Sequence, residues 1–285
     1  MKKKYFVLLI CIILINLSTP IFSQQEAVEI KKHSDIIPNY TELRTIHSKI
    51  IDDDYYLYIK LPKDYEETDS AYPVIYLLDG DIAFTMAWSS VRYLQYGKEL
   101  PDVIIVGIGY GSLLSSDEEN MRERDYTISK LSNRSESGGG ENFLKFLKSE
   151  LIPYVDSEYR TNPKKRIING YSFGGLFVMY TLVNEPELFR GWIAGSPYLS
   201  FDNEYLLEQM NHPSDQLKNS NSKLFISFGE LEDEDLYAKP ITEIVAKLNE
   251  LNFDKTQIRK RVFEGGTHFT CPSEAMVYGL KFLFE

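Results

Sequence analysis

The sequence predicts an α/β fold with a mostly parallel central sheet and helices on both of its faces. Short apolar runs alternate with segments of helical periodicity along most of the chain. Regular alternation of strand and helix favours parallel strands joined by crossover helices. We find no internal repeat and no low-complexity linker, so one domain over residues 24–285 is the simplest interpretation.

The predicted strands are short and apolar and are bounded by polar or glycine-containing turns. They cover residues 55–61, 73–78, 102–108, 166–169, 191–195, 223–228 and 257–263. The predicted helices fill residues 82–96, 141–152, 173–184, 237–251 and 273–284. A sheet of this kind carries its chemistry at the C-terminal ends of its strands.

Two polar stretches, residues 111–140 and 200–222, do not fit this alternation. Long connections of this kind in a compact domain are usually functional loops or disordered segments. We interpret both as walls of a pocket, and surface loops are the alternative.

Residues 1–23 have the pattern of a secretory signal peptide: three lysines, an apolar run from Tyr5 to about Leu17 and a polar break. The run is shorter than the ~20 residues that a membrane-spanning helix needs. We therefore expect an exported protein, periplasmic or secreted, without stable membrane insertion after cleavage. An uncleaved N-terminal anchor is the alternative.

The composition excludes some partners. The formal net charge is −11, and cleavage of the lysine-rich segment makes it more negative. An acidic surface disfavours nucleic acid and anionic membranes as partners. Of the two cysteines, Cys11 lies in the predicted signal peptide, so Cys271 has no partner for an internal disulfide after cleavage.

The segment "GYSFG" matches the G-x-S-x-G pattern of a nucleophile elbow and lies between the strand at 166–169 and the helix at 173–184. Gly170 and Gly174 suit a strained turn in which a Cβ atom would collide with neighbouring chain. Ser172 is therefore the candidate nucleophile.

A serine hydroxyl needs a base within hydrogen-bonding reach. In an α/β-hydrolase the nucleophile comes first, then the acid, then the histidine. Of the four histidines, only His268 follows the strand that should deliver the acid, and it lies in a loop after the last strand. His268 is therefore the candidate base.

Attack by the serine creates an oxyanion, which two backbone N–H groups usually stabilise. The elbow supplies the N–H of Phe173. The second candidate is the N–H of Asp81, in "DGDIAF" after the strand at 73–78, where Gly80 lets the backbone bend closely. A tight turn without this role is the alternative.

The ordered motifs of this chain resemble those of the putative-esterase group of the α/β-hydrolase superfamily. They are "YPVIYLLDG", "VIIVGIGY", "RERDYT", "GGGENFLKFLKSELIPYVDSEYR", "GYSFGGLFVMYTL", "GSPYLS" and "GGTHFT", and the match runs from about Tyr40 to the C-terminus. Within the group the chain is most similar to periplasmic siderophore esterases, which hydrolyse catecholate triesters. Feruloyl and acetylxylan esterases, S-formylglutathione hydrolases and mycolyl transferases are more distant relatives.

The resemblance implies a Ser-acid-His ester hydrolase that needs no metal and no cofactor. In this superfamily the acid commonly lies three residues after the glycine that ends the preceding strand, and counting from Gly229 gives Glu232. Its acidic neighbours remain open as alternatives; they are Glu230, Asp233, Glu234 and Asp235.

The basic-aromatic motif of the group corresponds to Arg122, Arg124, Asp125 and Tyr126. We expect Arg122 or Arg124, with Tyr126, to contact the acid or aromatic part of the ester. An ion pair with Asp125 or Glu123 is the alternative. One departure concerns the pocket, because Phe201 and Asp202 stand where many relatives have tryptophans.

The sequence thus predicts an exported carboxylic-ester hydrolase acting through an acyl-enzyme on a small-molecule or glycan ester. A carbohydrate esterase or an acyltransferase would use the same triad. A binding module without enzymatic activity is a further alternative, which the full set of serine, histidine and acidic candidates disfavours.

Overall fold

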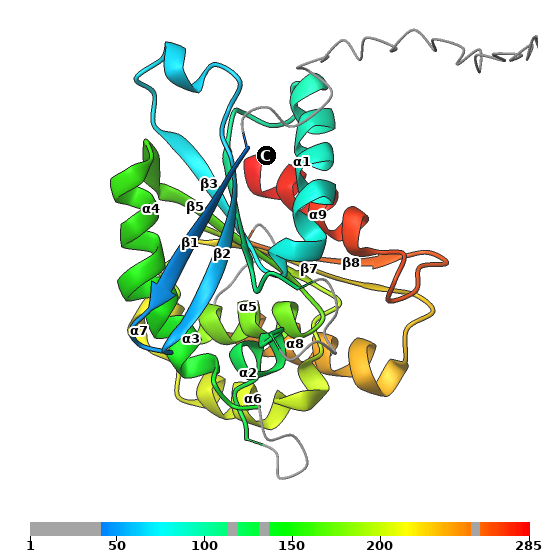
Figure 1. Cartoon of the computed structure of the whole chain (residues 1–285). Coiled ribbons are helices and arrows are strands. Elements are labelled where there is room, and N and C mark those ends of the chain that lie inside the picture. The colour runs from blue at the N-terminus through cyan, green and yellow to red at the C-terminus, as the bar shows by residue number, and fades with distance from the viewer. Residues whose placement is uncertain (1–40, 113–118, 131–136, 252–256) are drawn as a thin grey trace, which may run out of the picture. The chain divides into compact units, whose positions relative to one another are not determined.

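The computed structural model describes residues 41–112, 119–130, 137–251 and 257–285 (Figure 1). The predicted signal peptide, residues 1–23, lies outside the described residues. Within them, eight strands form one sheet in the order β1-β2-β4-β3-β5-β6-β7-β8. The strands are β1 Thr41–Ser48, β2 Asp53–Lys60, β3 Tyr72–Leu77, β4 Ile104–Gly109, β5 Thr161–Tyr171, β6 Gly191–Gly195, β7 Lys223–Gly229 and β8 Ile258–Phe263.

The sheet is parallel from β4 to β8, and the first two strands are antiparallel to their neighbours. Every residue of β3, β4 and β6 is buried, as expected for strands covered on both faces. This confirms the predicted α/β fold. The sequence prediction missed β1, whose polar residues are largely exposed at the edge of the sheet.

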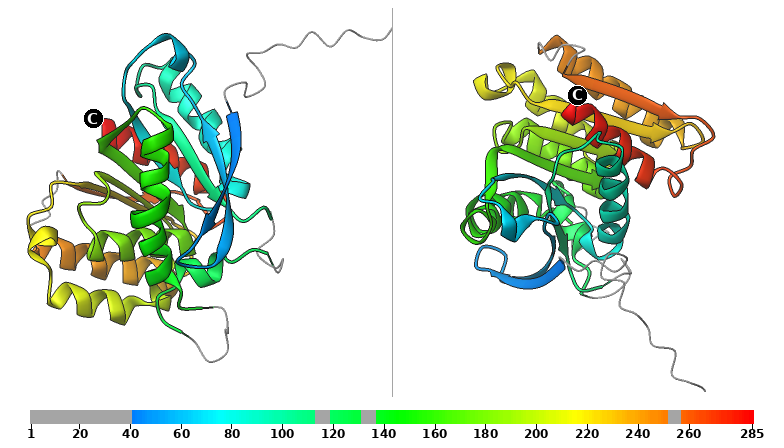
Figure 2. Two further views of the ribbon diagram at one scale, coloured as in Figure 1. Left: turned by 60° about the vertical axis from the view of Figure 1, so that its left-hand side comes forward. Right: turned by 90° about the horizontal axis from the view of Figure 1, so that it is seen from above.

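Helices cover both faces of the sheet (Figures 1 and 2). The α-helices are α1 Gly80–Tyr96, α2 Arg122–Tyr126, α3 Gly140–Phe146, α4 Ile152–Glu158, α5 Phe173–Asn184, α6 Asn203–Asn211, α7 Asp215–Lys218, α8 Lys239–Glu250 and α9 Pro272–Phe284. Helices α1 and α9 pack on one face, and α3 to α8 pack on the other. The sequence prediction missed α2, α6 and α7, which lie in the two stretches interpreted as loops.

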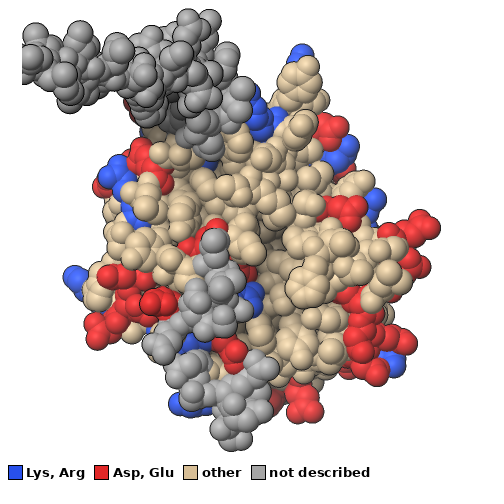
Figure 3. Space-filling view, turned by 45° about the vertical axis from the view of Figure 1, so that its right-hand side comes forward, with Lys and Arg blue, Asp and Glu red and all other residues tan. Residues whose placement is uncertain are grey.

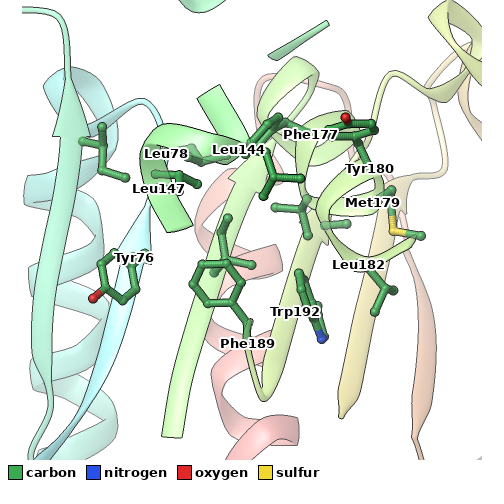
Figure 4. Packing of buried hydrophobic residues seen from close by; sticks show 14 of the residues in the cluster. Tyr76, Leu78, Leu144, Leu147, Phe177, Met179, Tyr180, Leu182, Phe189 and Trp192 are labelled. Carbon is green, nitrogen blue, oxygen red and sulfur yellow. The ribbon is translucent and has the colours of Figure 1, made fainter. Parts of the chain in front are cut away.

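The core divides according to the two-residue period of the strands. Tyr76 and Leu78 point to the layer that contains Phe177 of α5 and Trp192 of β6 (Figure 4). Ile75, at an alternate position of β3, packs in the layer of α1 and α9 on the opposite face of the sheet. Burial on both faces fixes the register of the sheet, because a slip of one residue would exchange the two layers.

One helical run is longer than predicted. The helical spacing of the apolar residues predicts a helix over residues 141–152. Instead, α3 continues through a π-helical turn, η2 (Leu147–Leu151), directly into α4. A π-helical turn reroutes backbone hydrogen bonds at the position where proline lacks its N–H, so the helix continues.

Candidate active site

The candidate nucleophile Ser172 lies in the turn between β5 and α5. Its backbone has φ 59° and ψ −119°, a region that residues with a side chain rarely adopt. The Ser172 N–H donates to the carbonyl of Gly195 at 3.0 Å, which ties the turn to β6. A Cβ atom on Gly170 would collide with the backbone of Gly174, so only glycine permits so tight a turn.

The predicted base and acid contact each other. His268 Nδ1 lies 3.2 Å from Glu232 Oε1, and the two side chains are 21% and 1% exposed. The N–H of Leu231 donates to the carbonyl of Gly266 at 2.9 Å, so the loop after β7 is joined to the loop after β8. A proton on Nδ1, directed at the carboxylate, leaves Nε2 of His268 available as a base.

The other acidic residues of this run make different contacts. Glu230 accepts a hydrogen bond from a backbone N–H of the loop after β8 at 2.8 Å. Asp233 caps the π-helical turn η4 (Glu234–Ala238) with its carboxylate. Glu234 and Asp235 pair with Lys239. Glu232 is thus the member of the run that contacts the histidine.

Two hydroxyl groups hold the acid and the base in place. Ser196 Oγ donates to Glu232 Oε1 at 2.8 Å. The hydroxyl of Tyr171 lies 2.8 Å from both Ser196 Oγ and the carbonyl oxygen of His268. Burial raises the pKa of Tyr171, so this hydroxyl remains a neutral donor. The sequence analysis missed both residues, although each lies within a motif that it used.

The predicted oxyanion donors are N–H groups in the first turns of two helices. Phe173 begins α5, and Asp81 is the second residue of α1; N–H groups at these positions have no acceptor within their helix. The carboxylate of Asp81 accepts from the N–H groups of Tyr110 and Gly111 at 2.6 and 2.9 Å. The start of α1 is thereby fixed against the end of β4.

Of the predicted substrate-contacting residues, Arg122 lines the cavity and the other two do not. Arg122 pairs with Asp79 through Nε to Oδ1 at 2.8 Å and Nη2 to Oδ2 at 3.1 Å. Arg124 instead pairs with the buried Asp125 at 2.7 Å, as the ion-pair alternative anticipated. Tyr126 is fully buried, and its hydroxyl accepts the N–H of Asp79 at 3.1 Å.

A cavity of about 490 Å³ opens beside Ser172 and His268, a size within the range of small-molecule sites. Figure 3 shows mostly uncharged surface across the middle of one face, with acidic residues toward its margin. Residues 200–222, one of the two polar stretches interpreted as pocket walls, do not line this cavity. The other stretch, residues 111–140, contributes Ser112, Asn120 and Arg122 to its lining. The apolar lining comes from Leu78, Ile82, Ala83, Met86, Phe269, Pro272 and Ala275, and the polar lining includes Asp79, Asp81, Ser112, Asn120 and Arg122.

Four aromatic rings pack together beside the start of α5, and none of them lines the cavity. Phe173 packs edge-to-face on Tyr198 and on Phe201, each at 5.3 Å between ring centroids. Tyr237 lies 5.7 Å from Tyr198 and 5.0 Å from the His268 ring. No pattern in the sequence pointed to Tyr237. Phe201 thus contributes a ring at a position where the resemblance led us to expect tryptophan.

Asp202, the second departure from the expected pattern, is buried and bonds to backbone groups. Its two carboxylate oxygens accept the N–H groups of Ile128 and Ser129 at 3.0 and 3.1 Å. It therefore anchors the segment that follows α2.

Within residues 41–112, 119–130, 137–251 and 257–285, no group of three or more His, Cys, Asp or Glu side chains is placed to hold a metal ion. Over the same ranges, no helix has the length and apolarity needed to cross a membrane.

Comparisons with known proteins bear on the family and the fold. A family model described as "Putative esterase" matches residues 48–269. The ferri-bacillibactin esterase BesA of Bacillus subtilis (strain 168) is 33% identical over 207 residues, which are 67% of this chain and 71% of BesA. The BES protein from Bacillus cereus has a TM-score of 0.72 and 27% identity, with 87% of this chain and 96% of that chain covered. An IroE-like serine hydrolase from Shewanella oneidensis has a TM-score of 0.73 and 27% identity, with 86% and 80% covered.

Proposed function

The chain belongs to the putative esterase family, and from that membership we propose that it hydrolyses siderophore-type carboxylic esters with Ser172 as nucleophile. The observation that carries this proposal is the contact of His268 with the buried carboxylate of Glu232. Both His268 and the elbow serine line one cavity. This is the arrangement that activates a serine hydroxyl for acyl transfer.

The reaction then proceeds through an acyl-enzyme. Ser172 Oγ attacks the ester carbonyl carbon as its proton passes to His268 Nε2, and Glu232 stabilises the imidazolium. The N–H groups of Asp81 and Phe173 stabilise the oxyanion. The intermediate collapses and expels the alcohol, which takes the proton from His268. A water molecule, deprotonated by His268, then cleaves the acyl-enzyme, releases the acid and restores the serine.

We propose a catecholate siderophore triester as the substrate class. The name of BesA denotes an esterase for a ferric siderophore, and another relative, from Escherichia coli O6:H1, is an apo-salmochelin esterase. Phe269 lines the cavity next to His268, and its ring suits an ester with an aromatic acyl part, because aromatic rings pack favourably on each other.

Labelling with a fluorophosphonate tests the nucleophile. We expect covalent label on Ser172 of the folded protein, located by peptide mass spectrometry. The Ser172→Ala variant and the heat-unfolded protein are the controls and should carry none. Absence of label on the folded wild-type protein would exclude a serine hydrolase mechanism.

A hydrolysis screen tests the substrate class. The panel contains a catecholate triester, a feruloyl sugar, an acetylated xylan fragment and p-nitrophenyl acetate as a general ester. We expect the highest kcat/KM with the catecholate triester. Preference for a sugar ester would favour a carbohydrate esterase, and acyl transfer to an added sugar in competition with water would favour a transferase.

We also propose that the protein is exported, on the basis of the pattern in residues 1–23. Cell fractionation tests this: the full chain should appear outside the cytoplasm with a shortened N-terminus. A variant without residues 1–23 should stay inside. Equal distribution of the two proteins would contradict export by this segment.

A further inference from the structure

The ion pair between Arg122 and Asp79 lies next to both predicted oxyanion donors. It is bidentate, and the two side chains are only 20% and 15% exposed. Asp79 comes two residues before Asp81, whose N–H is the first predicted donor. Arg122 lies over the ring of Phe173, whose N–H is the second, at 5.7 Å. The pair therefore contacts both segments that form the oxyanion hole.

Asp79 adopts a conformation that has to be held. It has φ 53° and ψ 43°, in the left-handed region, at the position that caps α1. A residue with a side chain persists there only when its surroundings impose the conformation. The Arg122 guanidinium holds its carboxylate, and the buried hydroxyl of Tyr126 holds its N–H. These contacts act together with the hydrogen bonds of the Asp81 carboxylate to set the orientation of the peptide that carries the Asp81 N–H.

The charge of Asp79 also bears on the reaction. Its Oδ2 lies so close to the elbow that a Cβ atom on Gly174 would approach it to 3.2 Å. A carboxylate at this place, if unpaired, would oppose the negative charge that develops on the oxyanion. Arg122 cancels that charge, whereas the Asp81 carboxylate already accepts three hydrogen bonds, two of them from backbone N–H groups.

We infer that Arg122 is a positioning residue, which acts through Asp79 to orient and electrostatically balance the oxyanion hole. The inference rests on the proposed serine hydrolase function. It differs from the expectation that Arg122 recognises the substrate. A positioning residue affects the transition state of every ester to a similar degree, whereas a recognition residue affects the binding of those esters that reach it.

The test compares Arg122→Gln, Asp79→Asn and the double variant on p-nitrophenyl acetate and on the catecholate triester. Asparagine tolerates the left-handed region, so Asp79→Asn removes the charge without forcing the backbone. We expect kcat to fall about 10- to 100-fold for each single variant on both esters, with KM within about twofold. The double variant should be no slower than the slower single variant, because the two residues act as one unit.

Binding of a boronic acid gives a second measurement. Boronates form a tetrahedral adduct with an active serine, so their affinity reports on the oxyanion hole. We expect the inhibition constant to rise about 10- to 100-fold in both single variants, in parallel with kcat. Arg122→Lys keeps the charge but loses the bidentate geometry and should be intermediate.

Arg166→Gln is the matched control. Arg166 pairs with Asp156, the side chains are 15% and 27% exposed, and neither residue lines the cavity. This variant should keep kcat and boronate affinity even if its stability falls. A kcat loss equal to that of Arg122→Gln would show a general effect of losing a buried ion pair and would overturn the inference.

Other outcomes are equally decisive. A rise in KM confined to the catecholate triester, with normal kcat on p-nitrophenyl acetate, would make Arg122 a recognition residue and overturn the inference. A double variant whose loss of kcat equals the product of the two single losses would also overturn the inference. If Arg122→Gln fails to fold, Asp79→Asn and Arg122→Lys decide by the same criteria. Failure of the proposed function is a separate result, because the wild-type protein would then neither hydrolyse any ester nor take up fluorophosphonate.

Discussion

At the scale of single residues, one carboxylate oxygen organises the candidate triad. Glu232 Oε1 receives hydrogen bonds from Ser196 and His268, so the acid is fixed by a residue outside the triad. Ser196 itself is fully buried and has φ 35°, a strained value for serine. In this conformation its hydroxyl reaches the carboxylate of Glu232 at 2.8 Å. Ser196 thus orients Glu232, and Glu232 in turn orients the candidate base His268.

Replacement of the acid tests this arrangement. Glu232→Gln keeps the shape of the side chain but cannot stabilise a charged imidazole, so kcat should fall by about three to four orders of magnitude. Asp233→Asn is the control and should keep near-normal turnover, since asparagine caps a helix as well as aspartate does. Circular dichroism checks the folding of both variants. Near-normal turnover of Glu232→Gln, with loss in Glu230→Gln or Asp233→Asn, would reassign the acid.

A partly buried lysine makes stability depend on pH. Burial lowers the pKa of Lys60 to about 8, nearby Arg92 adds to this effect, and Asp102 opposes it. The folded state therefore disfavours the charged amine. The resulting loss of stability is fully present below pH 8, where Lys60 is charged in both the folded and the unfolded protein. It disappears as pH rises from about 8 toward the ordinary pKa of lysine, about 10.5.

We therefore expect Lys60→Met to raise Tm at pH 7. Water screens part of the penalty at this partly exposed site, so we expect about 2–4 °C, the shift that ~1 kcal/mol produces in a chain of this size. The gain should shrink when the thermal scan is repeated near pH 10.5. Lys63→Met, at an exposed position nearby, is the control and should show no such trend. A Tm gain that grows as the pH rises would contradict a lowered pKa of Lys60.

At the scale of elements, the turn from β5 to α5 depends on close contact of two backbone segments. A Cβ atom on Gly170 would collide with backbone atoms of Gly174, which a side-chain rotation cannot relieve. The elbow thus cannot relax locally when this glycine is replaced. The strain would have to spread into the strand or the helix.

Gly170→Ala should lower stability by about 1–3 kcal/mol and reduce fluorophosphonate labelling of Ser172, because the turn has to open. Gly97→Ala is the control: its added Cβ would lie 3.6 Å from the nearest atoms, an ordinary contact, with φ −72°. Urea unfolding measures both variants. Equal stability of Gly170→Ala and the wild type would mean that the elbow is wider than the structure indicates.

The sequence was sufficient to predict elements whose residues share one environment. Strands buried on both faces appear as apolar runs, and β6 and α5 were predicted to the residue. β1 was missed because the alternation of apolar and polar residues is weak in an exposed edge strand. The short helix α2 was missed because its residues are mostly charged and it spans little more than one turn.

The candidate site was predicted as far as chain order constrains it. Ser172 and His268 follow from a local motif and from elimination, and the position of Glu232 agrees with a count from Gly229. The pairing of Arg122 with Asp79 could not be predicted, since it joins the starts of two helices, at residues 43 positions apart in the chain. Sequence shows which side chains can pair, and only the fold decides which loops meet.

At the scale of the whole molecule, the proposed reaction uses only side-chain and backbone groups of this chain. We therefore expect that excess EDTA leaves kcat/KM on p-nitrophenyl acetate unchanged. This ester binds no metal, so the result is independent of any metal carried by a siderophore. Loss of activity that returns on adding a divalent cation would contradict the expectation.

The sheet ends at β8, and this edge has a consequence for the behaviour of the protein in solution. Arg259, Lys260 and Arg261 follow one another along the strand, although the chain as a whole is acidic. Open strand edges invite pairing with another chain, and positive charges along an edge oppose it. Arg259 pairs with Glu285 at 2.8 Å, so two copies that met along β8 would bring together chiefly the charges of Lys260 and Arg261. We therefore expect the basic run to oppose pairing along this edge. A variant with neutral residues there should aggregate already at low salt, whereas the wild type should do so only at high salt, where charge repulsion is screened.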